Sequence, residues 1–144
     1  MRRKVFDVYA VPAVLVLIAA GSAAVIAVEM YLNLRNSAHG VLTRMGSDVH
    51  KFWGEPGFTD FDLYLSAKIT PDDFDDFAAR FNLLPVSPTH PISGTGISWG
   101  DCPEPWWPDN LSLVSARFHH NIDKEEFAVA TFHDGRVYYR LFGW

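Results

Sequence analysis

Residues 127–142 read FAVATFHDGRVYYRLF, and this stretch decides the fold of the chain. Asp134-Gly135 in its middle is typical of a two-residue β-turn, because both central positions need a positive φ angle that Asp and Gly tolerate. The residues on either side are rich in β-branched and aromatic side chains. The pattern predicts two strands, over 127–133 and 136–142, joined as a hairpin.

The turn fixes the register of this hairpin, and the register sorts its side chains onto two faces. The apolar pairs are Phe132 with Val137, Ala130 with Tyr139, and Ala128 with Leu141. We expect that face to be the core. The other face carries Val129, Thr131, His133, Arg136, Tyr138 and Arg140, and we expect it to lie toward solvent or a partner.

That second face is the predicted binding site. Arg offers a planar fork of donors for carboxylates, and Tyr offers a rigid amphipathic contact. We therefore expect any partner to be bound by Thr131, His133, Arg136, Tyr138 and Arg140. The alternative is an ordinary solvated sheet face, which needs no functional explanation.

Upstream of the hairpin, residues 60–69 alternate apolar and polar side chains, which predicts a half-buried strand. Thr70 and Asp73 then form a capping-box pattern with Pro71 at the first helical position. Apolar residues follow at helical spacing, at Phe74, Phe77, Ala78 and Phe81. With another strand expected over 113–120, the sequence predicts an α+β domain. Its sheet is small, four-stranded and mostly antiparallel, with one main helix packed on one face.

A long stretch rich in Pro, Gly and Ser, residues 84–110, separates the helix from the last three strands. So long an irregular segment in a small domain is often functional. Trp106 and Trp107 within it are candidate binding residues, as a platform for a sugar ring or for a partner's proline. The alternative, which we favour, is that these rings cover the open end of the sheet and fix the loop to it.

The N-terminal run 9–28, YAVPAVLVLIAAGSAAVIAV, contains no charged residue and is long enough to span a bilayer as a helix. Arg2, Arg3 and Lys4 precede it, and the positive-inside rule keeps that end in the cytoplasm. We expect a single-pass protein of the inner (plasma) membrane with residues 1–8 in the cytoplasm. Residues 9–28 form the transmembrane helix, 29–46 a linker or helix extension, and 47–144 an extracytoplasmic domain. A cleaved signal peptide is the alternative.

Composition excludes several classes of function. Residues 40–144 contain 8 Lys and Arg against 15 Asp and Glu, a formal net charge of −7. Nucleic acids are bound by basic surfaces, so we expect no nucleic acid among the partners. The expected partners are the membrane, through the N-terminal helix, and a protein of the cell envelope.

Residues with catalytic or metal-binding chemistry show no recognised spacing. Cys102 is the sole cysteine and lies between Asp101 and Glu104, whose charges would raise the thiol pKa and disfavour a nucleophile. His119 and His120 are neighbours on a strand, so they point to opposite faces. The acids of residues 72–76 fit the first turn of a helix. We expect no metal site and no cofactor.

Several elements together carry a family resemblance: Asp48-Val49-His50, Phe58-Thr59-Asp60 before a strand, Thr70-Pro71-Asp72-Asp73-Phe74, Trp106-Trp107-Pro108 and Asp134-Gly135-Arg136-Val137-Tyr138-Tyr139. In their order and spacing, residues 45–142 resemble small bacterial membrane-anchored or lipoprotein-type domains of unassigned activity. The resemblance implies a bacterial origin and a location in the cell envelope, and it implies no catalytic residue.

Two functions follow as hypotheses. The first is a non-enzymatic, membrane-anchored module whose acidic domain binds a protein partner or an envelope ligand. The second is a membrane-anchored enzyme of hydrolase type, with histidines and acids gathered near residues 84–110. Convergence of His50, His119, His120 and His133 with acids in one place would favour the second.

Overall fold

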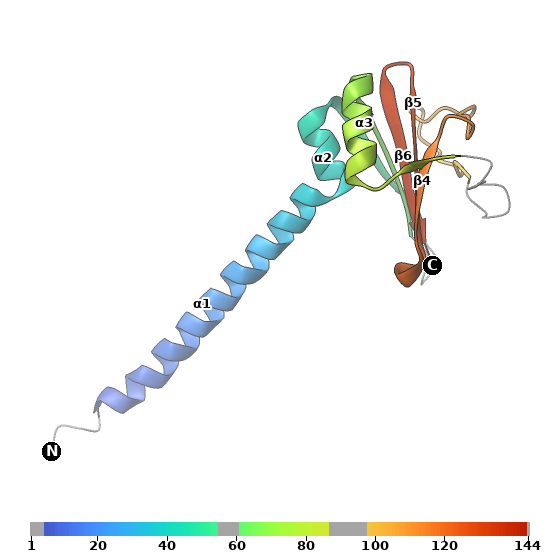
Figure 1. Cartoon of the computed structure of the whole chain (residues 1–144). Coiled ribbons are helices and arrows are strands. Elements are labelled where there is room, and N and C mark those ends of the chain that lie inside the picture. The colour runs from blue at the N-terminus through green and yellow to red at the C-terminus, as the bar shows by residue number, and fades with distance from the viewer. Residues whose placement is uncertain (1–4, 55–60, 87–97, 144) are drawn as a thin grey trace. The chain divides into compact units, whose positions relative to one another are not determined.

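The computed structural model of the protein describes residues 5–54, 61–86 and 98–143. It divides into two compact units, one that ends at Ser37 and one that begins at Ala38. Within the described residues, the first unit is one long helix and the second is an α+β domain (Figure 1).

Helix α1 (Val5–Asn36) makes up the first unit. Its stretch Ile18–Asn36 is long and apolar enough to cross a membrane, and none of it is buried. This stretch overlaps the second half of the predicted run 9–28. The Ser22 hydroxyl donates a hydrogen bond to the carbonyl oxygen of Ile18, so it is satisfied within the helix. The basic cluster of residues 2–4 lies outside the described residues.

The domain begins with helix α2 (Ala38–Met45), in a region that the sequence led us to describe as linker or helix extension. Val41 and Leu42 on this helix are fully buried in the domain core. Its sequence, AHGVLTRM, has Gly40 near its start, and glycine disfavours a helix interior. Tertiary packing of the apolar face therefore stabilises α2 more than local propensity does.

The sheet has six strands in the described residues, in the order β1-β2-β6-β5-β4-β3, and every neighbouring pair is antiparallel. The strands are β1 (Ser47–Gly54), β2 (Phe61–Lys68), β3 (Leu84–Pro85), β4 (Arg117–Asn121), β5 (Glu126–His133) and β6 (Arg136–Gly143). A short 3₁₀ helix, η1 (Ile122–Lys124), connects β4 to β5.

The predicted α+β class is confirmed, but the expected number of four strands was wrong. Sequence analysis missed β1, where a bulge and a positive φ angle at Asp48 interrupt the alternation of side chains. It also missed β3, which is only two residues long and contains a proline. The strand expected over 113–120 begins at Arg117 instead. Residue 60, the expected start of another strand, lies outside the described residues.

The hairpin register is confirmed. Phe132 lies opposite Val137, Ala130 opposite Tyr139 and Ala128 opposite Leu141. Asp134 and Gly135 in the turn have φ angles of 49° and 74°, as a two-residue hairpin turn of this kind requires.

Helix α3 (Pro71–Arg80) confirms the predicted capping box. The backbone N–H of Asp73 donates to the Thr70 hydroxyl, and the Asp73 carboxylate accepts from the backbone N–H of Thr70. The cap satisfies amide groups that would otherwise lack partners at the helix start. Phe74 and Phe77 on its inner face pack against the sheet with α2, in the core that the sequence predicted.

The opposite face of the sheet is also covered. Trp99, Cys102, Trp107 and Ala116, from the segment 98–116, form a second apolar cluster with aromatic residues of the sheet. Figure 1 shows α2 and α3 on one side of the sheet and this segment on the other. Residues Leu63–Ala67 of β2 are consequently all buried, so the expectation of a half-buried strand was wrong. The domain has three layers, with the sheet in the middle.

Candidate functional site

The predicted binding residues come together on the sheet face that lies under segment 98–116. Thr131 lies opposite Tyr138, and His133 lies opposite Arg136, across the β5–β6 ladder. Tyr138 and Trp107 belong to the same apolar cluster. The sequence therefore predicted correctly that these residues are neighbours. It placed them toward solvent or a partner, whereas the structure places Tyr138 against Trp107.

Most of this face does not lie open to solvent, so the expected exposure was wrong for its centre, although His133 at its end is exposed. Thr131 and Tyr138 are 2% and 5% exposed. The Trp107 ring stands edge-on to Tyr64 and Tyr138, with centroid distances of 5.0 and 5.6 Å. Trp107 thus fixes the loop to the sheet, as the favoured interpretation of the tryptophan pair predicted.

Trp106 takes a different position at the margin of the same layer. It is half-buried, and its ring stacks on the His50 imidazole of β1 with a centroid distance of 5.2 Å and an interplanar angle of 16°. Trp106 and Trp107 together bind segment 98–116 to β1, β2 and β6. Trp107, at 5% exposure, offers no open ring to a sugar, and one face of the Trp106 ring is occupied by His50.

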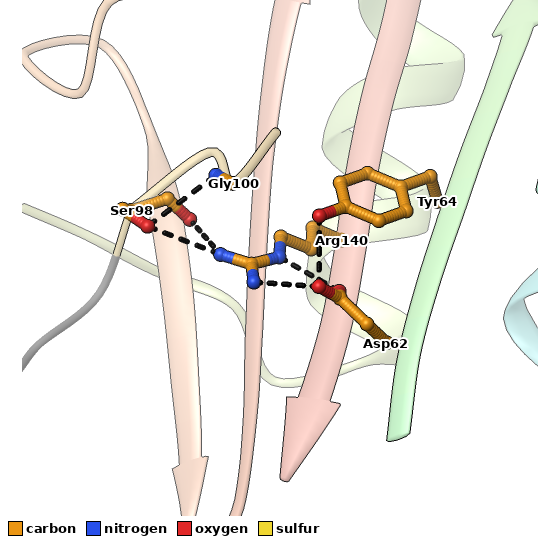
Figure 2. A network of polar contacts seen from close by, with 5 residues as sticks. All are labelled: Asp62, Tyr64, Ser98, Gly100 and Arg140. Atoms are coloured by element: carbon orange, nitrogen blue, oxygen red, sulfur yellow. Dashed lines mark hydrogen bonds and ion pairs between the residues drawn. The ribbon is translucent and has the colours of Figure 1, made fainter. Parts of the chain in front are cut away.

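Arg140 on β6 forms a polar network that links two strands to the loop (Figure 2). Its Nε and Nη2 atoms donate to the two carboxylate oxygens of Asp62 on β2, over 2.8 and 2.7 Å. Its Nη1 donates to the backbone carbonyl of Ser98, over 2.7 Å, and to the Ser98 hydroxyl. The Tyr64 hydroxyl donates to the same Asp62 carboxylate. One guanidinium thus joins two strands to the start of the loop.

The close approach of the loop backbone at Gly100 completes this network. Gly100 has a φ angle of 65°, in the left-handed region that favours glycine. Its backbone N–H donates to the Ser98 hydroxyl. Figure 2 shows Ser98 and Gly100 on the loop side of the Arg140 guanidinium, with Asp62 and Tyr64 on the other side.

Arg136, the second predicted binding arginine, has a network of its own near the start of β1. Its Nη1 donates to the Asp48 carboxylate and its Nη2 to the Asp48 carbonyl, over 2.6 and 2.8 Å. Its Nε donates to the Ser66 hydroxyl. Lys68 and His50 lie 3.3 and 3.0 Å from the Asp48 carboxylate. Both predicted binding arginines are therefore engaged inside the domain.

Sequence reasoning missed the acidic partners of these arginines. The β2–β6 register places Tyr64 opposite Arg140, with Asp62 on the same face two residues before Tyr64, and Lys68 opposite Arg136. The alternation of β2 already placed Asp62 and Tyr64 on one face. Pairing that polar face with the polar face of the hairpin would have indicated ion pairs instead of a solvated surface.

The pKa values of two potential nucleophiles at this face, Tyr64 and Cys102, are both raised. Burial, and then the hydrogen bond to Asp62, raises the pKa of Tyr64 far above its ordinary value. Burial raises the pKa of the Cys102 thiol, and the charges of Glu104 and Asp62 add to this against an opposing backbone hydrogen bond. The direction predicted for Cys102 is confirmed, with burial as the main cause. Neither group is a ready nucleophile.

The described histidines do not gather into one site. His50 contacts Asp48 and Trp106, while His119 and His120 lie on β4 and His133 contacts Asp134. No three His, Cys, Asp or Glu residues among those described are arranged to hold a metal ion. The criterion for the enzyme hypothesis is not met in this part of the chain. His90 lies outside it.

An open groove of about 430 Å³ lies on the helix side of the domain, between the end of α2 and the start of α3. Three of its polar side chains are already engaged, because Thr70 and Asp73 cap α3 and Lys68 pairs with Asp48.

Comparisons of the chain with protein-family models, with curated proteins and with solved structures find no match.

Proposed function

We propose that this chain is a single-pass membrane protein that holds an acidic α+β domain outside the cytoplasm, where the domain binds another protein of the cell envelope. In this proposal α1 crosses the inner membrane and its N-terminus stays in the cytoplasm. The domain acts by binding and catalyses no reaction.

The observation that carries the proposal is the exposed apolar surface of α1. Its stretch Ile18–Asn36 buries none of its residues, and large apolar side chains such as Ile18, Val25 and Ile26 are more than half exposed. So much exposed apolar surface on one helix is stable in lipid and unfavourable in water. The basic residues Arg2, Arg3 and Lys4 support the orientation with the N-terminus inside.

The binding role is supported by the chemistry of the domain. Arg140, Arg136 and Trp107 stabilise the fold through internal contacts, and the pKa values of Tyr64 and Cys102 lie on the wrong side for nucleophiles. No specific observation favours the hydrolase alternative, so we do not propose it. A rigid domain with an excess of acidic residues suits recognition of a protein with basic surface.

Topology reporters test the proposal. Alkaline phosphatase, which is active only outside the cytoplasm, should be active when fused after Trp144, and a fluorescent protein that matures only in the cytoplasm should be dark there. The mass of the purified chain should include Arg2, Arg3 and Lys4. The opposite reporter pattern would overturn the orientation, and loss of the first residues to a signal peptidase would overturn the anchor.

Crosslinking in intact membranes tests the binding role. A lysine-reactive crosslinker applied to cells that express the tagged full-length chain should capture another envelope protein in a constant ratio. The same chain with Leu63 and Leu65 replaced by Asp provides an unfolded-domain control, because both side chains are buried in the core. Equal recovery of the candidate partner with both chains would count against specific binding.

A further inference from the structure

β1 and β3 are the two edge strands of the described sheet, and β1, with 8 residues against 2, is the longer edge. β1 pairs with β2 on one side, and none of the described strands lies along its other side. Such an edge presents backbone N–H and C=O groups that a further strand can satisfy. We propose that β1 pairs, antiparallel, with β1 of a second copy of this chain.

The usable part of the edge is His50–Gly54. Over this range each residue of β1 is matched in turn to β2, from Ser66 to Asp62, without a shift. The bulge is confined to the start of the strand, between Ser47 and His50. Bulges commonly protect edge strands from pairing. Here the bulge protects only the start of β1 and leaves His50–Gly54 regular.

Two side chains on this edge are arranged for contact with an approaching strand. Trp53 is 53% exposed, although tryptophan is usually well buried. Lys51, on the same face, places its Nζ 5.2 Å from the centroid of the Trp53 ring. Exposed tryptophans are enriched among the residues that dominate protein–protein interfaces.

The described part of the β1 edge carries little net charge, although the domain as a whole is acidic. Lys51 is exposed, and Asp48 is neutralised by Arg136 and Lys68. The formal charge of −7 on residues 40–144 therefore lies mainly elsewhere. Charges more than about 8–10 Å apart are largely screened at physiological salt, so two such edges can meet without strong repulsion.

One register suits two identical strands. With Phe52 opposite Phe52 of the second copy, Lys51 lies opposite Trp53 of that copy, and two-fold symmetry repeats the pair. A lysine ammonium over an indole ring is an attractive contact. Every other register loses both Lys51–Trp53 pairs, and one of them places Lys51 opposite Lys51, which is repulsive. The two Lys51–Trp53 pairs thus favour the register centred on Phe52.

The pairing is expected to be weak in solution and effective in a membrane. One short strand pair buries less surface than a standard protein interface. Two copies anchored in the same bilayer meet at a high effective concentration, which lets a weak contact persist. In this respect the inference rests on the membrane anchoring proposed above.

Cysteine scanning of the full-length chain in its native membranes tests both the pairing and its register. Opposed residues of antiparallel strands have Cβ atoms about 4.5–5.5 Å apart, and diagonal neighbours about 7–8 Å apart. Disulfides need a Cβ separation of roughly 3.5–4.5 Å. On oxidation with copper phenanthroline, Phe52→Cys should therefore give a disulfide-linked dimer. Lys51→Cys or Trp53→Cys alone should give none, while the two co-expressed should give the mixed dimer.

The controls separate pairing from collision and from misfolding. Ile122 is highly exposed on η1, so the dimer yield of Ile122→Cys measures disulfides formed by random collision. The unmodified chain shows whether the buried Cys102 forms any dimer by itself. Phe52 contacts the Tyr64 ring, with centroids 6.0 Å apart, so its replacement can disturb the fold. The mixed Lys51 and Trp53 pair uses exposed positions only and avoids this difficulty.

Three results would overturn the proposal. The first is that neither Phe52→Cys nor the mixed pair gives a dimer. The second is that Lys51→Cys alone gives a dimer. The third is that the dimer yields of Phe52→Cys and of the mixed pair are no higher than that of Ile122→Cys. Crosslinking of Trp53→Cys mainly to a different protein would also contradict a second copy. Copper phenanthroline acts on both sides of the membrane, so the outcome does not depend on the topology reporters.

Discussion

The Cα of Gly100 lies so close to the Tyr64 hydroxyl that a Cβ atom added there would be 2.2 Å from that oxygen. The same atom would be 2.7 Å from Cζ of Arg140. No side chain other than the hydrogen of glycine fits between the loop backbone and the sheet at this point. The loop layer therefore depends on one position that carries no functional group.

Replacement of Gly100 by alanine should loosen this layer. A positive φ angle costs alanine about 1–2 kcal/mol, and the steric clash adds about 1–3 kcal/mol. We expect a lower thermal midpoint and faster labelling of the buried Cys102 by a thiol reagent in native conditions. Gly135→Ala is the matched control, because its φ angle is also positive but its surroundings are open. Equal labelling of Cys102 in both variants would contradict this explanation.

The Asp62–Arg140 ion pair should contribute to stability as a coupled unit. Both side chains retain some solvent access, at 26% and 11%, so we expect Asp62→Ala or Arg140→Met to cost about 1–3 kcal/mol each, below a fully buried pair. The double variant should lose less than the sum, by about 0.5–3 kcal/mol. Denaturant unfolding of the four proteins in non-ionic detergent measures this coupling. Strict additivity would indicate that the two residues act independently.

Phe77→Ala should destabilise the helix side of the domain. Phe77 is fully buried, with its ring edge-on to Tyr139 at 5.5 Å and close to Phe81 at 4.9 Å. Loss of a buried phenylalanine costs about 3–5 kcal/mol through lost burial and the cavity that remains. The neighbouring exposed substitution Asp76→Ala should change the free energy of unfolding by no more than about 0.5 kcal/mol. A Phe77→Ala protein with an unchanged unfolding midpoint would refute the proposed packing.

Stability should fall in acid because of Asp48. Hydrogen bonds from Arg136 and then Lys68 lower the pKa of Asp48 from 3.8 to about 2. Between these values the unfolded chain binds more protons than the folded one, so stability falls as pH falls from about 4 to 2. Asp48→Asn and Arg136→Met should each flatten this part of the curve of thermal midpoint against pH. A slope that persists in both variants would assign the acid sensitivity to other carboxylates.

Local patterns in the sequence predicted the parts of the fold that depend on neighbouring residues. Thr70 and Asp73 identified the start of α3, and Asp134-Gly135 fixed the β5–β6 register residue by residue. These features are governed by dihedral preferences and hydrogen bonds within a few residues. They do not depend on the rest of the chain, which is why they could be read correctly.

The candidate site could be predicted only in part, because its surroundings come from distant segments. Arg136, Tyr138 and Arg140 on β6 share one face of the hairpin with Thr131 on β5. This composition is typical of a solvated face. The partners of the two arginines are distant along the chain. Asp48 is 88 positions from Arg136, and Asp62 and Ser98 are 78 and 42 positions from Arg140. Periodicity carries no information on which distant carboxylate meets which arginine. The strand β1 was missed for a related reason, since the bulge near Asp48 breaks its alternation.

Burial of β2 on both faces has a consequence for how this protein can vary. In a sheet with one open face, every second side chain is exposed and can be replaced with little effect. Along Leu63–Ala67 each side chain packs against either the helices or the loop layer, so this alternation of tolerant and intolerant positions should be absent. A library of all single substitutions should find five consecutive intolerant positions there. Phe127–Thr131 of β5 is also buried without a break. We therefore expect both strands, each packed between two cores, to vary slowly.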